Sequence, residues 1–483
     1  MRAKILDLAI QGKLTDQRAE DGNAQDLLKD IQAEKEKLIK EQQIKKEKPL
    51  PEIEADEIPF EIPKNWMWAR WGTLSISIKY GYNTSAQKDG KIKMVRISDI
   101  QNNQVNWDSV PFCNIPKEEI TQYLLRKNDI LFARTGGTVG KSYLVSEVPE
   151  NVVYAGYLIR TRYSEKLSPQ YLKYFMESDL YWSQLKKGTT TTAQPNCNAK
   201  TLGKMVLPLP PLAEQKRIAD KVATLFAQLD AIDKAYEEYR ELQQTMKAKL
   251  LDLAVQGKLT DQRAEDGDAR DLFNDIQKEK QRLIAEKKIK KEKPLPEIEA
   301  DEIPFEIPTN WMWARLGDIV SKTIKRGKSP KYSITGDVLV FAQKCNTKPG
   351  RINLELAKKL DLSTLKKYPE EEFMLSGDIV INSTGNGTMG RVGFFRDKDN
   401  PYNLKIVPDS HVTTIRVLHD LIDSQYIFYF LKKLQPKLES SGDGSTNQKE
   451  LKATIIASIC IPLPPLDEQK RIVAKLDELL PLL

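Results

Sequence analysis

The longest regular pattern of apolar positions begins just after the proline-rich segment PLPPL at residues 208–212. From there, apolar side chains recur at alternating intervals of three and four residues, the spacing of one face of a helix. The pattern ends before Gly257, a residue type that commonly follows the last turn of a helix. The stripe consists of Val222, Leu225, Leu229, Ile232, Tyr236, Tyr239, Met246, Leu250 and Leu253. We predict a helix of about 40 residues, on the order of 60 Å long. Its apolar face needs an apolar partner, and the nearest candidate is a copy of this region re-formed by the chain termini and packed antiparallel.

A shorter helix is predicted after the loop TDQRAEDGNA, with Leu27, Ile31, Leu38 and Ile39 on one side. Its other face mixes lysine with glutamate, which is more typical of a solvated surface than of a nucleic-acid interface. The prolines of the following segment, KPLPEIEADEIPFEIP, exclude helix and favour an extended strap. The strap leads to a W-x-W motif, which is expected to anchor it: Trp66 and Trp68, repeated as Trp311 and Trp313.

Much of the chain consists of an internal sequence repeat. Residues 3–72 match residues 248–317 at an offset of 245, and only 14 of these 70 positions differ. A second block, residues 207–225, matches residues 461–479 at an offset of 254. Between the blocks lie two unlike segments, the first insert (residues 73–206) and the second insert (residues 318–460). The sequence therefore predicts one scaffold in two copies that carries two different inserts.

The repeated blocks are in circular order. The chain stops at Leu483, which matches Leu229, and its first block matches the sequence from residue 248 onward. Placed end to start, the termini nearly re-form the central region. We predict that the termini pack together as a copy of that region and give a pseudo-twofold molecule.

The positive charge of the chain is confined to the inserts. The first insert has 18 basic and 11 acidic residues, the second has 22 and 16, and the remainder has 35 and 41. The inserts thus carry +7 and +6, whereas the scaffold carries −6, within a formal net charge of +7. Because binding to phosphates depends on nearby cations, this distribution favours a polyanion that meets each insert.

Within the inserts, short clusters combine cations with amides, hydroxyls and tyrosine, the side chains that contact phosphates and base edges. Any single cluster is also compatible with a plain polar loop, but two pairs, Gly188 with Gly442 and Gln194 with Gln448, share the offset of 254. The candidate DNA-contact residues of the first insert are Lys79, Tyr82, Arg96, Arg134, Thr135, Lys141, Lys187, Thr190 and Gln194. Those of the second insert are Lys325, Arg326, Lys328, Lys331, Gln343, Lys344, Asn382, Ser383, Arg391 and Gln448.

Two glycine loops resemble phosphate-binding motifs, RTGGTVGKS at residues 134–142 and TGNGTMGR at residues 384–391. A phosphate loop needs a helix to begin directly after it. Here both loops continue into short β-branched and aromatic segments, which favours strand-turn-strand. The sequence therefore disfavours nucleotide binding. A hairpin presented to a DNA groove and a purely structural turn both remain open.

Several function classes find little support in the sequence. The four cysteines lie far apart without metal-ligand spacing, and the only histidines, His411 and His419, both lie in the second insert. No metal site and no histidine-based catalytic site common to both halves is expected. No stretch reaches the roughly 20 apolar residues of a membrane span, and the N-terminus lacks the apolar centre of a signal peptide. A cytoplasmic protein is expected.

The blocks PLPPLAEQKRI and IPLPPLDEQKRI, each behind a distinct insert, together with the two glycine loops, resemble the specificity subunit of type I restriction-modification systems. The resemblance covers nearly the whole chain. It implies that each insert is a target recognition domain reading half of a bipartite DNA site, and that the repeats form a coiled-coil spacer. It further implies two docked modification subunits, which carry S-adenosylmethionine and methylate adenine, and restriction subunits that use ATP with magnesium. No cofactor is expected in this chain, and no catalytic residue.

The expected fold class is α+β and multidomain, with two mixed α/β recognition domains joined by long antiparallel helical coiled-coil spacers. The expected segments are N-terminal scaffold helices (1–48), a first recognition domain with its strap (49–206), a central helical spacer (207–293), a second recognition domain with its strap (294–460) and a C-terminal helix that packs with the N-terminus (461–483). The main alternative is a free-standing transcription regulator with two DNA-binding domains. A nucleotide-dependent enzyme built on the glycine loops is the third hypothesis.

Overall fold

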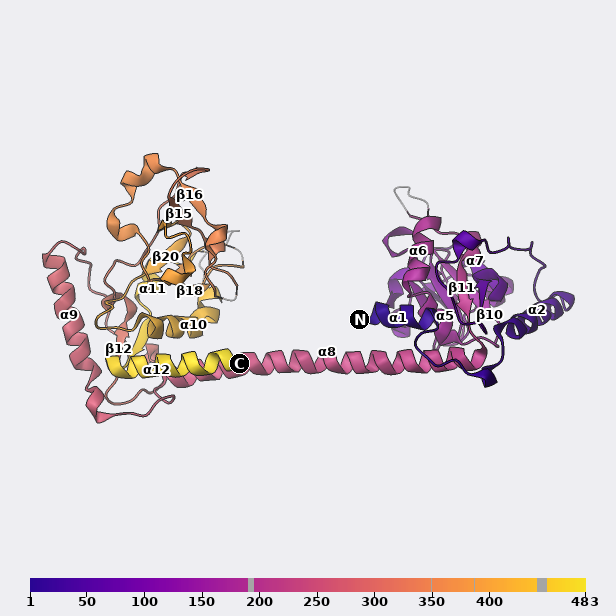
Figure 1. The fold of residues 1–483 in the computed structure, drawn as a ribbon, viewed down its shortest axis with the longest axis horizontal. Helices are drawn as coiled ribbons and strands as arrows, with labels where there is room; N and C mark the ends of the chain where they lie inside the picture. The colour runs from indigo at the N-terminus through magenta and orange to yellow at the C-terminus, as the bar shows by residue number, and fades with distance from the viewer. Residues whose placement is uncertain (190–194, 349, 386, 441–449) are drawn as a thin grey trace. The chain divides into compact units, whose positions relative to one another are not determined.

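A computed structural model describes residues 1–189, 195–348, 350–385, 387–440 and 450–483. The chain divides into two compact units, Met1–Ala235 and Tyr236–Leu483 (Figure 1). Each unit contains one insert together with a copy of both repeated blocks. The mixed helix and strand content confirms the predicted α+β class. None of the helices in the described ranges is long and apolar enough to cross a membrane.

The first unit is built on two sheets. A four-stranded antiparallel sheet has the order β2-β10-β7-β8, formed by Ser75–Tyr80, Leu158–Tyr163, Ile130–Ala133 and Ser142–Leu144. A three-stranded sheet has the order β6-β3-β9, formed by Phe112–Cys113, Ile92–Val95 and Val152–Tyr154, with β3 and β9 parallel. A separate short hairpin joins β4 (Ile100–Gln101) to β5 (Gln104–Val105). The helices before α8 are α1 (Arg2–Ile10), α2 (Ala24–Lys40), α3 (Trp71–Leu74), α4 (Lys117–Tyr123), α5 (Pro169–Phe175), α6 (Asp179–Gly188) and α7 (Ala199–Lys204).

The second unit repeats the strand order of the antiparallel sheet although its insert has an unlike sequence, and its other sheet has one strand more. Its antiparallel sheet has the order β13-β20-β17-β18, formed by Lys325–Arg326, Val412–Ile415, Ile379–Asn382 and Val392–Phe394. The other sheet has the order β14-β16-β15-β19, formed by Tyr332–Ser333, Lys358–Leu360, Val338–Phe341 and Lys405–Pro408, with β15 and β19 parallel. Its helices after α8 are α9 (Ala269–Ala285), α10 (Ser424–Ser440), α11 (Ala453–Ala457) and α12 (Leu466–Leu479). The shared strand order allows the two inserts to be matched element by element.

The predicted long helix is confirmed as α8, which runs over 44 residues from Leu212 to Val255. Gly257 follows it with a φ of +67°, where a side chain would also collide with the ring of Pro308. The first third of α8 packs into the core of the first unit through Ile218 and Val222. Its last turns pack into the core of the second unit through residues such as Leu251.

The repeated blocks meet at the base of each insert. In the first unit, β1 (Met67–Arg70) pairs antiparallel with β11 (Val206–Leu209), so the insert starts and ends at adjacent strands. In the second unit, β12 (Met312–Arg315) pairs in the same way with β21 (Cys460–Leu463). The two repeated blocks are therefore brought together by the fold itself.

A buried glutamate from PLPPLxEQ joins the two blocks within each unit. The indole nitrogen of Trp66 donates to Glu214 at 2.7 Å, and Gln17 donates to the same carboxylate at 2.7 Å. In the second unit, the Trp311 indole donates to Glu468 at 2.8 Å, with Gln262 at 2.6 Å. Trp66 and Trp311 are buried, which agrees with their predicted anchoring role.

The outer tryptophan of each W-x-W motif packs on the strap. The ring of Trp68 lies 5.2 Å from that of Phe60, and the ring of Trp313 lies 5.1 Å from that of Phe305. The straps are extended apart from one short helical turn in each. The predicted strap and its aromatic contacts are thus confirmed.

The chain ends lie in different units. Helix α1 packs on α5 and α6 of the first unit, and α12 packs on α10 of the second. The expected packing of the two ends against each other, the pseudo-twofold arrangement and the boundaries of the five segments stay predictions.

Candidate nucleic-acid interface

The first glycine loop is a turn between two strands. Strand β7 ends at Ala133, a single 3-10 turn covers Gly136–Thr138, and β8 begins at Ser142. Gly140 has a φ of +91°, and a side chain there would collide with Leu185 and Trp182. The second loop likewise connects two strands, β17 and β18, without a helix between them in its described residues. The predicted strand-turn-strand geometry is confirmed, and neither loop provides the helix N-terminus on which a phosphate loop depends.

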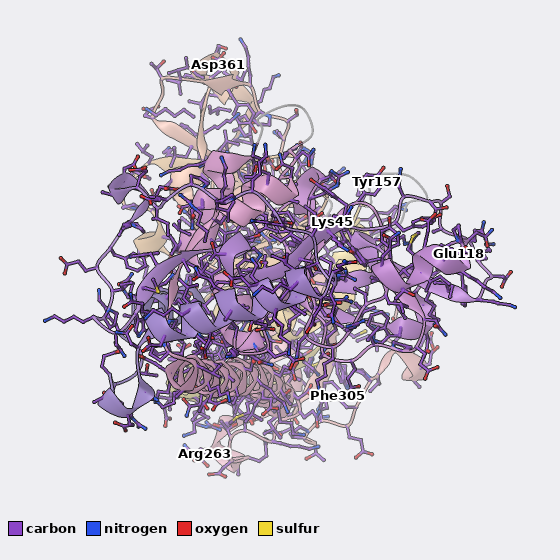
Figure 2. The ribbon with its side chains drawn as sticks, turned by 90° about the vertical axis from the view of Figure 1, so that its right-hand side faces the viewer. Lys45, Glu118, Tyr157, Arg263, Phe305 and Asp361 are labelled. Atoms are coloured by element: carbon purple, nitrogen blue, oxygen red, sulfur yellow. The ribbon has the colours of Figure 1, made fainter. Side chains whose placement is uncertain are left out.

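Arg134 is positioned by contacts within its own unit. Its guanidinium lies 4.9 Å from the centre of the Tyr80 ring, and its Nε donates to the carbonyl of Gly156 at 3.0 Å. Its backbone N–H donates to the carbonyl of Tyr157, whose side chain is 60% exposed (Figure 2). Tyr157 was missed by the sequence reasoning, because an isolated tyrosine in a loop carries no periodic signal.

The other described candidates of the first insert differ in accessibility. Lys79, Lys141 and Lys187 are exposed, whereas Thr135 and Tyr82 are half-buried. The ring of Tyr82 packs 5.2 Å from that of Tyr123. Arg96 pairs with Asp99 at 2.7 Å, a contact that raises the pKa of the guanidinium. Candidates Thr190 and Gln194 lie outside the described residues.

In the second insert, several candidate cations surround one carboxylate. Glu372 is buried and accepts a hydrogen bond from Lys325 at 2.6 Å, with Lys322 and Lys328 each at 3.8 Å. Burial raises the pKa of Glu372, but the hydrogen bond from Lys325 and the three lysine charges outweigh it and lower the pKa overall. These lysines are therefore held in place by an internal counter-charge.

Two further candidate cations of the second insert, Arg326 and Lys331, are also paired with carboxylates. Arg326 pairs with Glu450 at 3.0 Å, and Lys331 pairs with Asp361 at 2.8 Å (Figure 2 labels Asp361). Lys344 is exposed. Exposed pairs of this kind contribute little to stability, so these cations could exchange their carboxylates for phosphates at small cost.

Two candidates of the second insert lie inside it. Asn382 and Ser383 are fully buried, and Ser383 Oγ lies 2.6 Å from Thr413 Oγ1. The Asn382 amide donates to the carbonyl of Gln343 at 3.1 Å. These two residues shape the base of the second glycine loop and are not presented at the surface.

Arg391 and Gln343 both contact the second glycine loop. Arg391 donates to the carbonyls of Asn346 at 2.7 Å and Gly387 at 3.3 Å. Thr388 donates to the side chain of Gln343 at 3.2 Å. Candidate Gln448 lies outside the described residues.

A cavity of about 480 Å³ lies beside the first glycine loop and brings together residues from three parts of the insert. Thr138 and Lys141 come from the loop, Lys173 and Trp182 from α5 and α6, and residues 101–103 from the β4–β5 hairpin. The hairpin was missed as an element by sequence reasoning. The signal that could have found it is the pair Asn102-Asn103, because asparagine favours the left-handed positions of a two-residue turn.

The cysteines are free thiols. Burial raises the pKa of the Cys197 and Cys345 thiols to about 11, which keeps both protonated and poorly suited to bind a metal. Within the described ranges, no group of three or more histidine, cysteine or acidic side chains could hold a metal ion.

The family described as "Type I restriction modification DNA specificity domain" matches residues 78–239 and 308–481, more than half of the chain. The chain is 26% identical to the type I restriction enzyme EcoEI specificity subunit of Escherichia coli and 27% identical to the EcoAI specificity subunit of the same organism. Each similarity covers 99% of this chain and 88% of the relative.

Solved structures show the same fold. The HsdS subunit from Thermoanaerobacter tengcongensis aligns with a TM-score of 0.53 at 20% sequence identity, covering 87% of this chain and 90% of that one. The family match to both inserts and their flanking scaffold agrees with this similarity of fold. The chain belongs to the family of type I restriction-modification DNA specificity subunits, which recognise DNA and are not themselves catalysts.

Proposed function

We propose that the chain binds a bipartite, asymmetric DNA site, one half through each insert, and docks two methyltransferase subunits that modify adenine. Restriction subunits would join the assembly through these partners. The proposal depends on the pair of inserts, whose antiparallel sheets share one strand order but which present different side chains. Two such domains should read two different half-sites, and their positive excess of +7 and +6 suits the phosphates of both.

The duplicated scaffold supports two equivalent docking sites. The same carboxylate, tryptophan and glutamine contacts recur at Glu214 and Glu468, and the same ion pair recurs between Arg217 and Asp21 and between Arg471 and Asp266. Near-identical surfaces should bind two copies of one partner.

Helix α8 offers an apolar surface for a helical partner. Five side chains at spacings of three and four residues are between 44% and 62% exposed, namely Ile232, Tyr236, Tyr239, Leu242 and Met246. Large apolar residues in a continuous exposed stripe are typical of an interaction surface. We assign this stripe, called here the α8 stripe, to subunit assembly.

The cofactors belong to the proposed partners. S-adenosylmethionine for methyl transfer, and ATP with magnesium for restriction, would bind the partner subunits. The strand-turn-strand form of both glycine loops supports this, since it lacks the helix that nucleotide phosphates favour.

An insert exchange tests the proposal. Residues 73–206 are replaced by the insert of another specificity subunit, and methylated adenines are mapped by single-molecule sequencing of cellular DNA. We expect one half of the methylated sequence to change and the other half to stay. Since the insert starts and ends at the adjacent strands β1 and β11, the exchange should leave the scaffold intact.

A matched control comes from the repeat itself. Replacing residues 3–72 by residues 248–317 changes only 14 positions and should leave the methylated sequence unaltered. A change of both halves after the insert exchange would refute modular reading. Recovery of the chain from its host without any methyltransferase would instead favour the free-standing regulator.

A further inference from the structure

The β4–β5 hairpin of the first unit presents four consecutive amides. Residues 101–104 read Gln-Asn-Asn-Gln, and all four are exposed. Gln101 pairs with Gln104 across the strands, while Asn102 and Asn103 form the turn with φ values of +50° and +56°. Two left-handed central residues define a tight turn whose twist matches that of the flanking strands. The amides are therefore held on a defined scaffold.

The base of the hairpin is anchored in an apolar cluster. Ile100 and Val105 pack with Trp107 against the cluster that contains Leu131 and Tyr143. Asn103 donates to Glu177 at 3.1 Å, and Glu177 also accepts from Lys173. Within the described part of the chain, the amides of Asn102 and Gln104 make no side-chain hydrogen bond, so both retain their full donor and acceptor capacity.

The second unit has a longer turn at the corresponding place, with different chemistry, of which Pro349 lies outside the described residues. After β15, which matches β3 by its parallel pairing, Asn346 and Ile352 form an antiparallel bridge. Within this turn Thr347 N–H donates to the carbonyl of Arg351 at 3.0 Å. Lys348 and Arg351 are both exposed. The position that carries amides in the first unit thus carries cations in the second.

Both turns lie beside equivalent cavities. In the second unit a cavity of about 570 Å³ is lined by Lys348 from the turn, by Gly385 and Arg391 from the second glycine loop, and by Gln435 and Glu439 from α10. The first unit combines a turn, a glycine loop and helices in the same way. Each unit thus has a cavity lined by a turn, a glycine loop and helices, and the two units differ in the side chains at the turn.

We propose that these turns are the base-reading elements of the two inserts. The amides of residues 101–104 would read adenine edges, and Lys348 with Arg351 would read guanine. The major groove admits a two-stranded β-ribbon, asparagine and glutamine pair with adenine N6 and N7, and arginine and lysine pair with guanine O6 and N7. This inference rests on the proposed function and adds to it the class of base read by each half.

The test uses the full chain assembled with its methyltransferase subunits and a DNA library randomised in both half-sites. The first variant combines Asn102→Gly, which keeps the left-handed turn, with Gln104→Ala. We expect preference for adenine at one or two positions of one half-site to fall by roughly 5- to 150-fold, the range of a single bidentate contact. The other half-site should be unaffected.

The reciprocal variant, Lys348→Ala with Arg351→Ala, should lower preference for guanine in the other half-site only. Gln25→Ala, which removes an exposed amide from scaffold helix α2, is the control and should change nothing. Melting temperature and subunit assembly are measured for each variant. If the double variant does not assemble, Gln104→Ala alone is tested, because the exposed Gln104 side chain makes no hydrogen bond within the described residues.

The outcomes separate the two proposals. A uniform loss of affinity for all sequences, or unchanged preferences, overturns the assignment of the hairpins while leaving the proposed function in place. A wild-type assembly that shows no bipartite preference refutes the proposed function before any variant is measured.

Discussion

At the scale of single residues, the two units contain the same ion pair between a buried arginine and a glutamate of the strap. Arg315 is 4% exposed and donates to both carboxylate oxygens of Glu302, at 2.8 and 2.7 Å. Arg70 binds Glu57 in the same way in the first unit. Such bidentate pairs fix the strap against the strands at the base of the insert.

The Glu302 pair predicts a pH-dependent stability. The hydrogen bonds from Arg315 lower the pKa of Glu302 from its ordinary 4.5 to about 2. A carboxylate with a depressed pKa stabilises the fold above its unfolded value, and this stabilisation is lost as the pH falls from about 4.5 toward 2. We expect Glu302→Gln to lower the unfolding temperature of the second unit near pH 6, with a difference from wild type that shrinks on acidification.

The measurement is thermal unfolding at a series of pH values. Glu306→Gln, an exposed change in the same strap, serves as the control and should have little effect at any pH. A difference for Glu302→Gln that does not vary with pH would contradict the role given to this pair.

The candidate site could be predicted from sequence only in part at this scale. The basic excess and the glycine loops were visible, and Lys79, Lys141, Lys187 and Lys344 are indeed exposed. Burial was not visible: Asn382 and Ser383 have polar side chains that suit a surface, yet both are buried, at the end of strand β17 and directly after it. Whether a polar residue is buried depends on tertiary packing, which a local pattern does not record.

At the scale of elements, long periodic segments were predictable and short ones were not. The spacing of apolar residues gave the existence of α8, and the Gly-rich loops followed by β-branched residues gave the turns between strands. The β4–β5 hairpin has only two residues in each strand, too few for alternation to appear. The glycine loops showed in the sequence that the inserts correspond in part, but the match of their antiparallel sheets became visible only through strand order.

The α8 stripe leads to a prediction about assembly. Tyr239→Glu places a charge at the centre of the stripe, where the wild-type side chain is 55% exposed and supports no core. We expect the units to keep their stability but binding to the methyltransferase subunits to weaken by about tenfold or more, because a charge would be buried without a partner.

The binding is measured by titration of purified subunits. Gln244→Glu introduces the same charge on the opposite side of α8 and is the matched control. Equal weakening by both variants would indicate a general effect of charge on the helix and would exclude the α8 stripe as the contact.

At the scale of the whole molecule, each unit contains its own pair of repeated blocks. All the contacts of Glu214 with Thr15, Gln17 and Trp66 lie within the first unit. Those of Glu468 with Thr260, Gln262 and Trp311 lie within the second. The duplication was evident in the sequence, but which block pairs with which was not, because two near-identical copies offer two possible pairings.

This pairing predicts independent stabilities. Glu468→Ala leaves three donors without their acceptor and should destabilise the second unit by about 3 kcal/mol, while the first unit is unaffected. Glu214→Ala should have the converse effect. Hydrogen exchange measured by mass spectrometry reports protection for each unit separately. Equal loss of protection in both units from either single change would contradict this division.

The antiparallel ribbons at the base of each insert have a consequence for how such proteins diversify. Since β1 lies beside β11 and β12 beside β21, the chain leaves the scaffold and returns to it at one point. Residues inserted or deleted between these paired strands therefore change neither the length nor the helical register of α8. If each insert reads DNA as proposed, a new sequence preference needs only the exchange of one insert, and the rest of the chain stays unchanged.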